Sequence, residues 1–145
     1  MKIKKISNNK KQYLNLLLLG DEQENMIDKY LDKGDMYVLY EDKAVAQCVV
    51  TCNGNNVYEI KNLSVLPDYQ RKGYGKALID FVFNTYKGKE LIVGTGESPA
   101  TLIFYEKCGF SYSHRIKNFF TDNYHKPIYE EGVLLEDMVY LKKLW

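Results

Sequence analysis

One stretch decides the fold: Leu63-Ser64-Val65-Leu66-Pro67-Asp68-Tyr69-Gln70-Arg71-Lys72-Gly73-Tyr74-Gly75-Lys76-Ala77-Leu78. It begins as a strand, passes through a glycine-bearing turn and opens a helix. Such a turn directs several backbone N–H groups to one point, at the positive end of the helix dipole. Gly73 and Gly75 carry no Cβ and so allow an anion to approach the backbone. Three basic side chains add positive charge: Arg71, Lys72 and Lys76. The stretch therefore predicts an anion site suited to a pyrophosphate.

Two other phosphate-binding loops are excluded by their spacing. A nucleoside-triphosphate loop needs Gly-x4-Gly-Lys-Ser/Thr, and no such run occurs in the chain. A dinucleotide fold needs Gly-x-Gly-x-x-Gly at the first helix of a parallel unit. In this chain the Gly-x-Gly comes mid-chain, after two hairpin strands, and the third glycine is missing.

Outward from this stretch, apolar spacing and turn signals predict the order strand, two helices, three strands, helix, strand, helix, two strands. Strands are expected at 2–6, 36–40, 44–51, 57–66, 90–93, from 110 onward and at 133–143, and helices at about 8–19, 22–33, 74–87 and 99–108. Asn53-Gly54-Asn55-Asn56 predicts a hairpin, and Gly94-Thr95-Gly96 predicts the end of a strand. The order predicts an α/β fold: a central mixed, mostly antiparallel sheet with helices on both faces, in one domain over residues 1–145.

Composition narrows the class of protein. The 145 residues suit one domain, and 20 basic residues against 19 acidic ones argue against nucleic acid as a partner. Three cysteines do not form a disulfide framework, and the spacing of cysteines and histidines does not fit a metal site. The longest apolar run near the start, Leu16 to Leu19, is too short to cross a membrane, and nothing resembles a signal peptide. We therefore expect a cytoplasmic enzyme or binding protein without a metal and without a membrane partner.

Three segments resemble those of one family. Gln70-Arg71-Lys72-Gly73-Tyr74-Gly75 resembles the Gln/Arg-x-x-Gly-x-Gly/Ala motif with which the GNAT (GCN5-related N-acetyltransferase) superfamily binds acetyl-CoA. Upstream, Glu59-Ile60-x-x-Leu63-x-Val65-x-Pro67 resembles the fourth strand of that family. Downstream, Phe104-Tyr105-Glu106-Lys107-Cys108-Gly109-Phe110 resembles its Leu/Phe-Tyr-x-Lys-x-Gly-Phe segment. The resemblance covers residues 57–112. It implies a GNAT-like fold whose sheet splays between the Glu59 strand and the Glu90 strand, with acetyl-CoA as co-substrate.

The resemblance also implies which residues contact the coenzyme. They belong to the strand end, the glycine loop and the following helix-strand-helix unit: Leu63, Ser64, Val65, Gln70, Arg71, Lys72, Gly73, Tyr74, Gly75, Lys76, Ser98 and Tyr105. Ser98 stands where the family often has an asparagine, and its side chain has a shorter reach.

Two catalytic residues follow from the same resemblance. Tyr105 is the candidate general acid toward the coenzyme sulfur, with a core aromatic ring as the alternative. Glu59 is the candidate base that takes the proton of the acceptor amine, since it is a carboxylate in a strand-forming segment. The alternatives for Glu59 are a solvent-facing residue or a partner of Lys61. Glu97 is the rival base, directly or through water, or else a favourable charge at a helix N-terminus.

The predicted activity is direct transfer of an acetyl group from acetyl-CoA to a primary amine, with a small molecule as the favoured acceptor. A protein or peptide acceptor and a non-catalytic acyl-CoA-binding module are the alternatives. Cys108, His114 and His125 are expected to be structural or surface residues. The apolar end of the last strand, Leu144-Trp145, makes a homodimer the candidate assembly.

Overall fold

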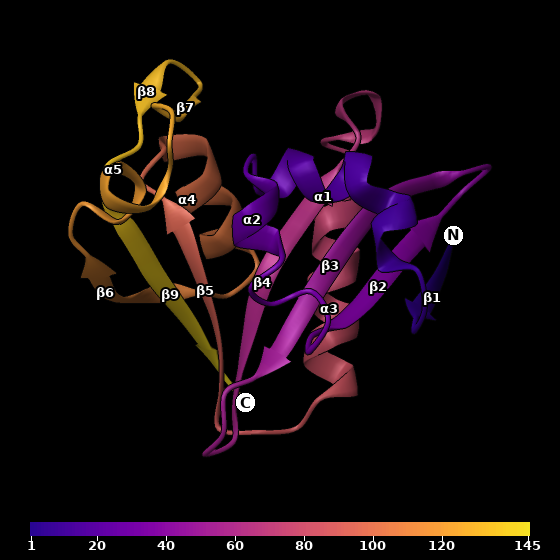
Figure 1. The fold of residues 1–145 in the computed structure, drawn as a ribbon. Helices are drawn as coiled ribbons and strands as arrows, with labels where there is room; N and C mark the ends of the chain where they lie inside the picture. Colours follow the sequence, from indigo (N-terminus) through magenta and orange to yellow (C-terminus); the bar gives the residue numbers. More distant parts are fainter. The chain divides into compact units, whose positions relative to one another are not determined.

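The structure is a computed structural model that describes residues 1–145 and divides into two compact units, residues 1–89 and 90–145. Figure 1 labels the helices and strands of each unit. The first unit contains β1 (Lys2–Ile6), the 3-10 helix η1 (Lys10–Tyr13), α1 (Leu14–Gly20), α2 (Glu24–Ile27), β2 (Asp35–Tyr40), β3 (Ala44–Cys52), β4 (Val57–Val65), the 3-10 helix η2 (Pro67–Tyr69) and α3 (Tyr74–Thr85). The second unit contains β5 (Glu90–Gly96), α4 (Pro99–Lys107), β6 (Ser111–Ile116), α5 (Phe119–Asn123), β7 (Tyr129–Glu130), β8 (Val133–Leu134) and β9 (Met138–Leu144).

In the first unit, β1 to β4 form an antiparallel sheet in chain order. The hairpin between β3 and β4 turns at Gly54, Asn55 and Asn56, which all have positive φ. Glycine and asparagine adopt this conformation at little steric cost. Asn53 N donates to Val57 O at 2.9 Å and closes the turn. The hairpin predicted from the sequence is therefore present.

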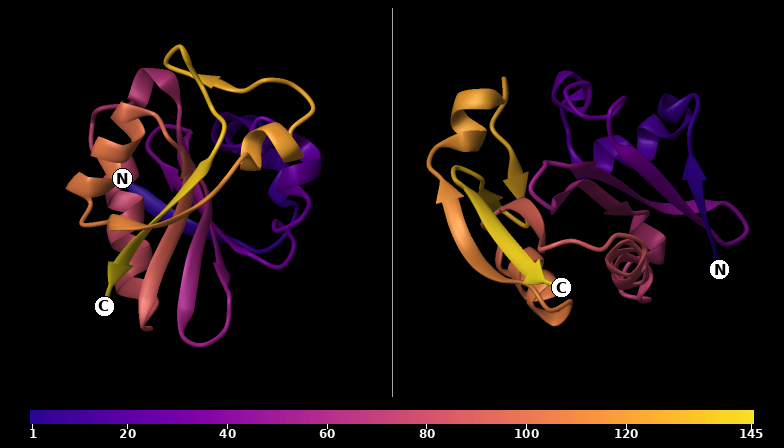
Figure 2. Two further views of the ribbon diagram at one scale, coloured as in Figure 1. Left: turned by 90° about the vertical axis from the view of Figure 1, so that its left-hand side faces the viewer. Right: turned by 90° about the horizontal axis from the view of Figure 1, so that it is seen from below.

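Helices cover both faces of this sheet (Figure 2). Successive strand residues point to opposite faces, so Met36 and Val38 lie on one face and Tyr37 on the other. The first face packs against α1, α2 and the turn that follows, and its buried cluster consists of Leu17, Ile27, Tyr30, Leu31, Met36, Val38 and Val49. On the second face, the Tyr37 ring lies 5.2 Å from that of Phe81 on α3.

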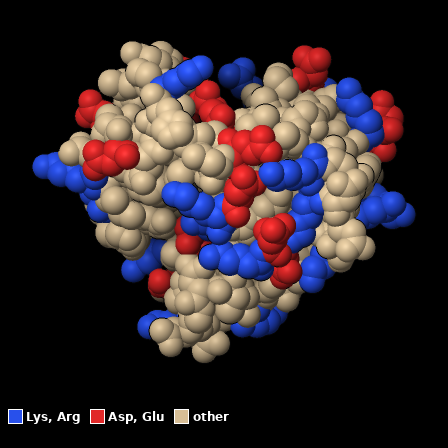
Figure 3. Space-filling view, in the orientation of Figure 1, with Lys and Arg blue, Asp and Glu red and all other residues tan.

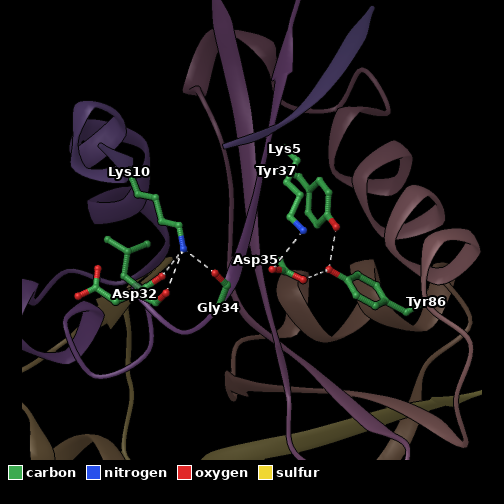
Figure 4. A network of polar contacts seen from close by, with 8 residues as sticks. Lys5, Lys10, Asp32, Gly34, Asp35, Tyr37 and Tyr86 are labelled. Atoms are coloured by element: carbon green, nitrogen blue, oxygen red, sulfur yellow. Dashed lines mark hydrogen bonds and ion pairs between the residues drawn. The ribbon is translucent and has the colours of Figure 1, made fainter. Parts of the chain in front are cut away.

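Polar contacts join η1 and the residue after α3 to the start of β2 (Figure 4). The Lys10 ammonium donates to the carbonyl oxygen of Gly34 at 2.6 Å and to that of Leu31 at 2.8 Å. On the other side of the strand, the Tyr86 hydroxyl donates to Asp35 at 2.5 Å. Because its proton is used in that bond, Tyr86 accepts at 2.7 Å from the Tyr37 hydroxyl.

In the second unit, β9 pairs antiparallel with β5 on one side and with β6 on the other. The buried side chains of this unit come from these strands, from α4 and from the segments that flank them: Leu91, Val93, Tyr105, Cys108, Phe110, Leu135, Val139 and Leu141. Gly109 has a φ of 96° and ends α4, close to the end that the sequence predicts.

Two local predictions were wrong. Gly94-Thr95-Gly96 does not end its strand, because all three residues pair with β9. A Cβ on Gly94 would lie 2.6 Å from the Met138 Sδ, so the glycine accommodates a neighbouring side chain and does not mark a break. The helix expected over 22–33 is helical only in α2, and turns follow it, although Tyr30 and Leu31 are buried as their spacing indicated.

The segment after β6 also differs from the prediction. The last strand begins at Met138, whereas the sequence predicted a start at residue 133. Residues 129–134 form a small hairpin of β7 and β8, whose turn residues Glu131 and Gly132 have positive φ. The short helix α5 was not predicted, because its five residues provide too little periodicity.

Charged side chains of both signs are interspersed on the face drawn in Figure 3. Several form ion pairs, such as Lys76 with Asp80 at 2.8 Å and Lys11 with Asp28 at 2.7 Å. No helix of the structure has the length and apolar character that crossing a membrane requires.

Candidate active site

The glycine loop between β4 and α3 has the backbone conformation that its sequence predicts. Gly73 is the N-cap of α3 with a φ of 91°, and Arg71 also has a positive φ of 62°. The Gln70 side-chain amide donates to Val65 O at 3.1 Å and so fixes the loop to the end of its own strand. A Cβ on Gly73 would meet no atom within 4 Å, which leaves space beside the backbone.

This loop fits the pyrophosphate of a coenzyme. The first N–H groups of an α-helix have no partner within the helix and carry partial positive charge. Around this end of α3, the side chains of Arg71, Lys72 and Lys76 are exposed. Lys76 pairs with Asp80, and the Lys72 ammonium lies 5.6 Å from the centre of the Tyr69 ring. The donors, the positive charge and the open space beside Gly73 are what a diphosphate needs.

Tyr74 is held by a residue outside the loop. Its hydroxyl donates to Glu41 Oε2 at 2.7 Å, while the Met1 amino group lies 2.9 Å from Glu41 Oε1. These two partners lower the pKa of Glu41, the amino group having the larger effect. The same hydrogen bond raises the pKa of Tyr74. The β2–β3 turn thus supports the first turn of α3.

Glu59 on β4 is a buried carboxylate, 7% exposed. Its Oε1 accepts from the Asn53 side-chain amide at 2.8 Å, and its Oε2 lies 3.3 Å from the Lys61 ammonium. The Lys61 pairing that the sequence left open is therefore present. A charged partner and a hydrogen-bond donor satisfy a carboxylate that would otherwise be costly to bury.

Asn62 and Ser64 form a buried polar network that the sequence did not reveal. The Ser64 hydroxyl donates to Leu16 O at 2.6 Å, and the Asn62 side-chain amide donates to Leu17 O at 3.0 Å. Gln47 on β3 donates to both Asn62 and Ser64. The network fixes the end of α1 to β4, next to Leu63 and Val65.

Tyr30 extends this network. Its hydroxyl accepts from Asn62 at 3.0 Å and donates to Asp21 at 3.1 Å. Burial, together with the nearby carboxylate of Asp21, raises the pKa of Tyr30. Tyr30 is therefore neutral at physiological pH and acts as a hydrogen-bonding link.

The candidate acid Tyr105 lies on α4 and is 7% exposed. Its ring packs edge-on against two others, with 5.0 Å between the ring centres to Phe104 and 5.5 Å to Phe110. This packing is what the core alternative predicted, and it also holds the phenol in one orientation. Burial and orientation are compatible with either role.

Ser98, the N-cap of α4, is 0% exposed. Its hydroxyl donates to Glu130 Oε1 at 2.6 Å, and the Thr101 hydroxyl donates to the same oxygen. Since a hydroxyl has one proton, Ser98 has none left to donate to a coenzyme in this arrangement. The structure thus brings Ser98 together with Glu130 on the β7–β8 hairpin.

Glu97 is not a free carboxylate. Arg115 donates to both of its oxygens, at 3.0 and 2.8 Å, and also to Asp137 at 2.9 Å. The pKa of Arg115 is raised, because Glu97 in the first place and Asp137 in the second accept its hydrogen bonds.

The remaining cysteines and histidines have structural surroundings. Cys108 is the buried C-cap of α4. Burial raises the pKa of the Cys48 thiol to about 12. The His114 ring stacks on Tyr140 at 4.8 Å. The structure contains no group of three or more His, Cys, Asp or Glu side chains arranged to hold a metal ion.

Comparison with known proteins identifies the family. The model of the acetyltransferase (GNAT) domain matches residues 32–112. An uncharacterised N-acetyltransferase of Bacillus subtilis strain 168, YvbK, is 35% identical over 131 residues, which are 87% of this chain and 84% of the relative. The chain belongs to the GNAT family, and it is therefore an acetyl-CoA-dependent acetyltransferase, as the sequence predicted.

Solved structures extend the likeness over nearly the whole chain. A GNAT family acetyltransferase from Elizabethkingia anophelis with acetyl-CoA bound is 34% identical with a TM-score of 0.93, covering 99% of this chain and 97% of that one. An IAA acetyltransferase from Bacillus cereus ATCC 14579 is 31% identical with a TM-score of 0.93, covering 99% of both chains. An acetyltransferase from Bacillus subtilis in complex with CoA is 30% identical with a TM-score of 0.90, covering 99% of this chain and 98% of that one.

These structures confirm the predicted α/β fold with a mostly antiparallel sheet and flanking helices. Acetyl-CoA is confirmed as the co-substrate. The individual coenzyme contacts, the catalytic roles of Tyr105 and Glu59, the splay of the sheet and the single-domain organisation stay predictions.

Proposed function

We propose that this chain transfers the acetyl group of acetyl-CoA directly to a primary amine of a small molecule, without an acetylated enzyme intermediate. The observation that carries the proposal is the loop at the N-terminus of α3. Its left-handed Gly73, open space and basic surroundings suit a diphosphate. The candidate residues for the chemistry belong to both units: Gln70 to Lys76 and Glu59 to the first, Tyr105 and Ser98 to the second.

In the proposed reaction, the amine nitrogen bonds to the acetyl carbonyl carbon while the bond from that carbon to the coenzyme sulfur breaks. Tyr105 donates its phenolic proton to the departing thiolate. Glu59, directly or through water, takes the proton that the amine loses. Glu59 then releases its proton to solvent and the Tyr105 phenol takes one up, so that each turnover yields one amide and one thiol.

The partners that the two carboxylates bind support Glu59 over Glu97 as the base. Arg115 binds both oxygens of Glu97, whereas Oε2 of Glu59 lies 3.3 Å from a lysine and Oε1 accepts from a neutral amide. The packing of Tyr105 between two aromatic rings supports its role, because a positioned proton donor needs a fixed orientation.

The test is calorimetric titration with acetyl-CoA and with CoA, followed by thiol release with a panel of small amines and a lysine-containing peptide. Binding with thiol release that depends on a small amine supports the proposal. Release with the peptide alone would move the acceptor to a protein, and binding without any release would favour a non-catalytic module. Absence of binding would refute the proposed role of the loop.

Tyr105→Phe tests the acid. We expect kcat to fall by roughly 10²–10⁴-fold and the acetyl-CoA affinity to change much less, since the proton donor is lost while the ring remains. Tyr129→Phe is the matched control, because Tyr129 is exposed on the β7–β8 hairpin. An unchanged kcat in Tyr105→Phe would assign that ring to the core alone.

The homodimer and the cytoplasmic location predicted from the sequence belong to the same proposal. Leu144, near the end of β9, is 62% exposed, which leaves an apolar side chain for a second copy to cover. Sedimentation analysis at working concentration tests the dimer, and a strict monomer would rule it out.

A further inference from the structure

Three glutamates near the candidate chemistry differ in how their oxygens are used. Both oxygens of Glu59 have partners, Asn53 and Lys61. Both oxygens of Glu97 accept from Arg115. Glu130 is different, because its Oε1 accepts two hydroxyl protons while its Oε2 makes no bond with the protein and is not buried. Glu130 is therefore the one of the three with an oxygen available to a ligand.

The occupied oxygen fixes the direction of the open one. Ser98 is the N-cap of α4 and Thr101 lies in its first turn, and both hydroxyls donate to Oε1. Two donors at a single oxygen hold the plane of the carboxylate. The N-terminal turn of α4 also favours a negative charge at this place. Glu130 thus presents Oε2 in a defined orientation.

The hairpin that carries Glu130 is attached on both sides of its turn. Leu135, just after β8, is buried against Gly96 at the end of β5, where an added Cβ would lie 2.5 Å from the Leu135 Cδ1. Leu135 N donates to Ile128 O at 2.9 Å and closes the base of the hairpin. The carboxylate is consequently fixed between the end of β5 and the first turn of the helix that carries Tyr105.

Glu130 is bonded to the N-terminal end of the helix that carries Tyr105. Tyr105 is seven positions after Ser98, which corresponds to about 10 Å along a helix axis. Side chains of a helix lean toward its N-terminus, so the Tyr105 side chain extends back in the direction of the Ser98 turn. A molecule that reaches from one place to the other is a short chain with a nitrogen at each end.

We propose that Oε2 of Glu130 binds a cationic nitrogen of the acceptor, and that this nitrogen is not the one acetylated. The inference depends on the proposed function, because it names the acceptor class of the same site. A carboxylate that binds an ammonium group raises the pKa of that group. The bound nitrogen therefore stays protonated and cannot attack a thioester, so a second amine must be the nucleophile. The acceptor class is thus an amine that carries a second ammonium group.

The experiment compares 1,4-diaminobutane with butylamine as acceptors. For the unsubstituted protein we expect a kcat/KM about 10-fold or more in favour of the diamine, the worth of one charge-assisted hydrogen bond. Glu130→Gln keeps an oxygen for the two hydroxyls and replaces the open oxygen by an NH₂ group. We expect it to abolish the preference, measured as the ratio of the kcat/KM values for the two acceptors. Glu131→Gln, the same change on the neighbouring exposed residue, is the control and keeps the preference.

A second measurement does not depend on turnover. Calorimetric titration of 1,4-diaminobutane into the CoA-saturated protein is expected to show binding that Glu130→Gln weakens at least 10-fold. Equal affinity of the two proteins, or no binding to the unsubstituted one, would overturn the inference. Thiol release with butylamine but no preference for the diamine would overturn it too, and would leave the proposed function intact. Failure to bind acetyl-CoA would instead refute the proposed function, and titration into the free protein would still test Glu130.

Discussion

Replacing Asn62 by alanine tests the buried network that fixes α1 to β4. Asn62 is 3% exposed, and its side chain makes three hydrogen bonds: to Leu17 O and Tyr30 Oη, both at 3.0 Å, and from Gln47 Nε2 at 2.7 Å. Each such bond contributes about 1 kcal/mol net to stability, and a buried group left without a partner costs more. We expect Asn62→Ala to lower the free energy of unfolding by about 3 kcal/mol.

Urea unfolding, followed by circular dichroism, measures this loss. With a slope of about 1–3 kcal/mol per molar urea, a loss of this size moves the midpoint by roughly 1–3 M. Asn8→Ala is the matched control, because Asn8 is exposed and a surface substitution changes stability by about 0.5 kcal/mol at most. A loss below about 1 kcal/mol for Asn62→Ala would refute the reasoning, since the removal of three buried hydrogen bonds should lower the free energy of unfolding by more than that.

A double-mutant cycle with Gly20 makes the test specific. A Cβ on Gly20 would lie 1.9 Å from the Asn62 Oδ1, an overlap that requires movement, while the next group outside Asn62 is Leu63 O at 3.1 Å. Gly20→Ala should therefore cost less in the Asn62→Ala background than alone, with a coupling of about 1 kcal/mol or more. Equal costs in the two backgrounds would show that the Asn62 side chain does not occupy this space.

Three further predictions concern separate parts of the chain. Gly73→Ala adds a side chain to a residue whose φ is 91°, which strains the backbone by about 1–2 kcal/mol. We expect acetyl-CoA binding, measured by calorimetry, to weaken about 10-fold. An unchanged affinity would mean that the loop does not hold the diphosphate. Iodoacetamide at pH 8 should label the exposed Cys52 and leave Cys48 unmodified, because burial raises the pKa of Cys48 to about 12. Mass spectrometry of the peptides measures the labelling, and a labelled Cys48 would contradict its burial. Tyr86→Phe removes its hydrogen bonds with Asp35 and Tyr37 and should cost about 1–3 kcal/mol in urea unfolding; a loss below about 0.5 kcal/mol would contradict the network of Figure 4.

The sequence predicts those parts of the fold whose signal is local. The Asn53–Asn56 hairpin and the glycine loop depend on positive φ angles, which glycine and asparagine mark in the chain itself. Gly94 and Gly96 gave the wrong prediction for a related reason. Their lack of a side chain accommodates Met138 and Leu135, which lie about 40 residues further on, and a local pattern contains no information about those neighbours.

The candidate site was predictable in part for the same reason. Their positions in the family motif identify Glu59 and Tyr105 as candidates. Which oxygens of a candidate carboxylate are already hydrogen-bonded depends on partners distant in sequence. Arg115 is 18 residues from Glu97, and Glu130 is 32 residues from Ser98. Polar partners at such separations leave no periodicity, so only the folded chain reveals which carboxylates are engaged.

The pairing of Arg115 bears on the choice of the base. If Glu97 took a proton from an amine, its carboxylate would become neutral while Arg115 stayed charged, because a guanidinium is not deprotonated in proteins. Both hydrogen bonds from Arg115 would then weaken, and Asp137 alone would retain a strong bond to it. Glu59 lies 3.3 Å from the Lys61 ammonium, a longer contact than either bond from Arg115 to Glu97, and the Asn53 amide can still donate, more weakly, to a neutral carboxyl oxygen. We therefore keep Glu59 as the proposed base, while Glu97 joins the start of α4 to β6 through Arg115.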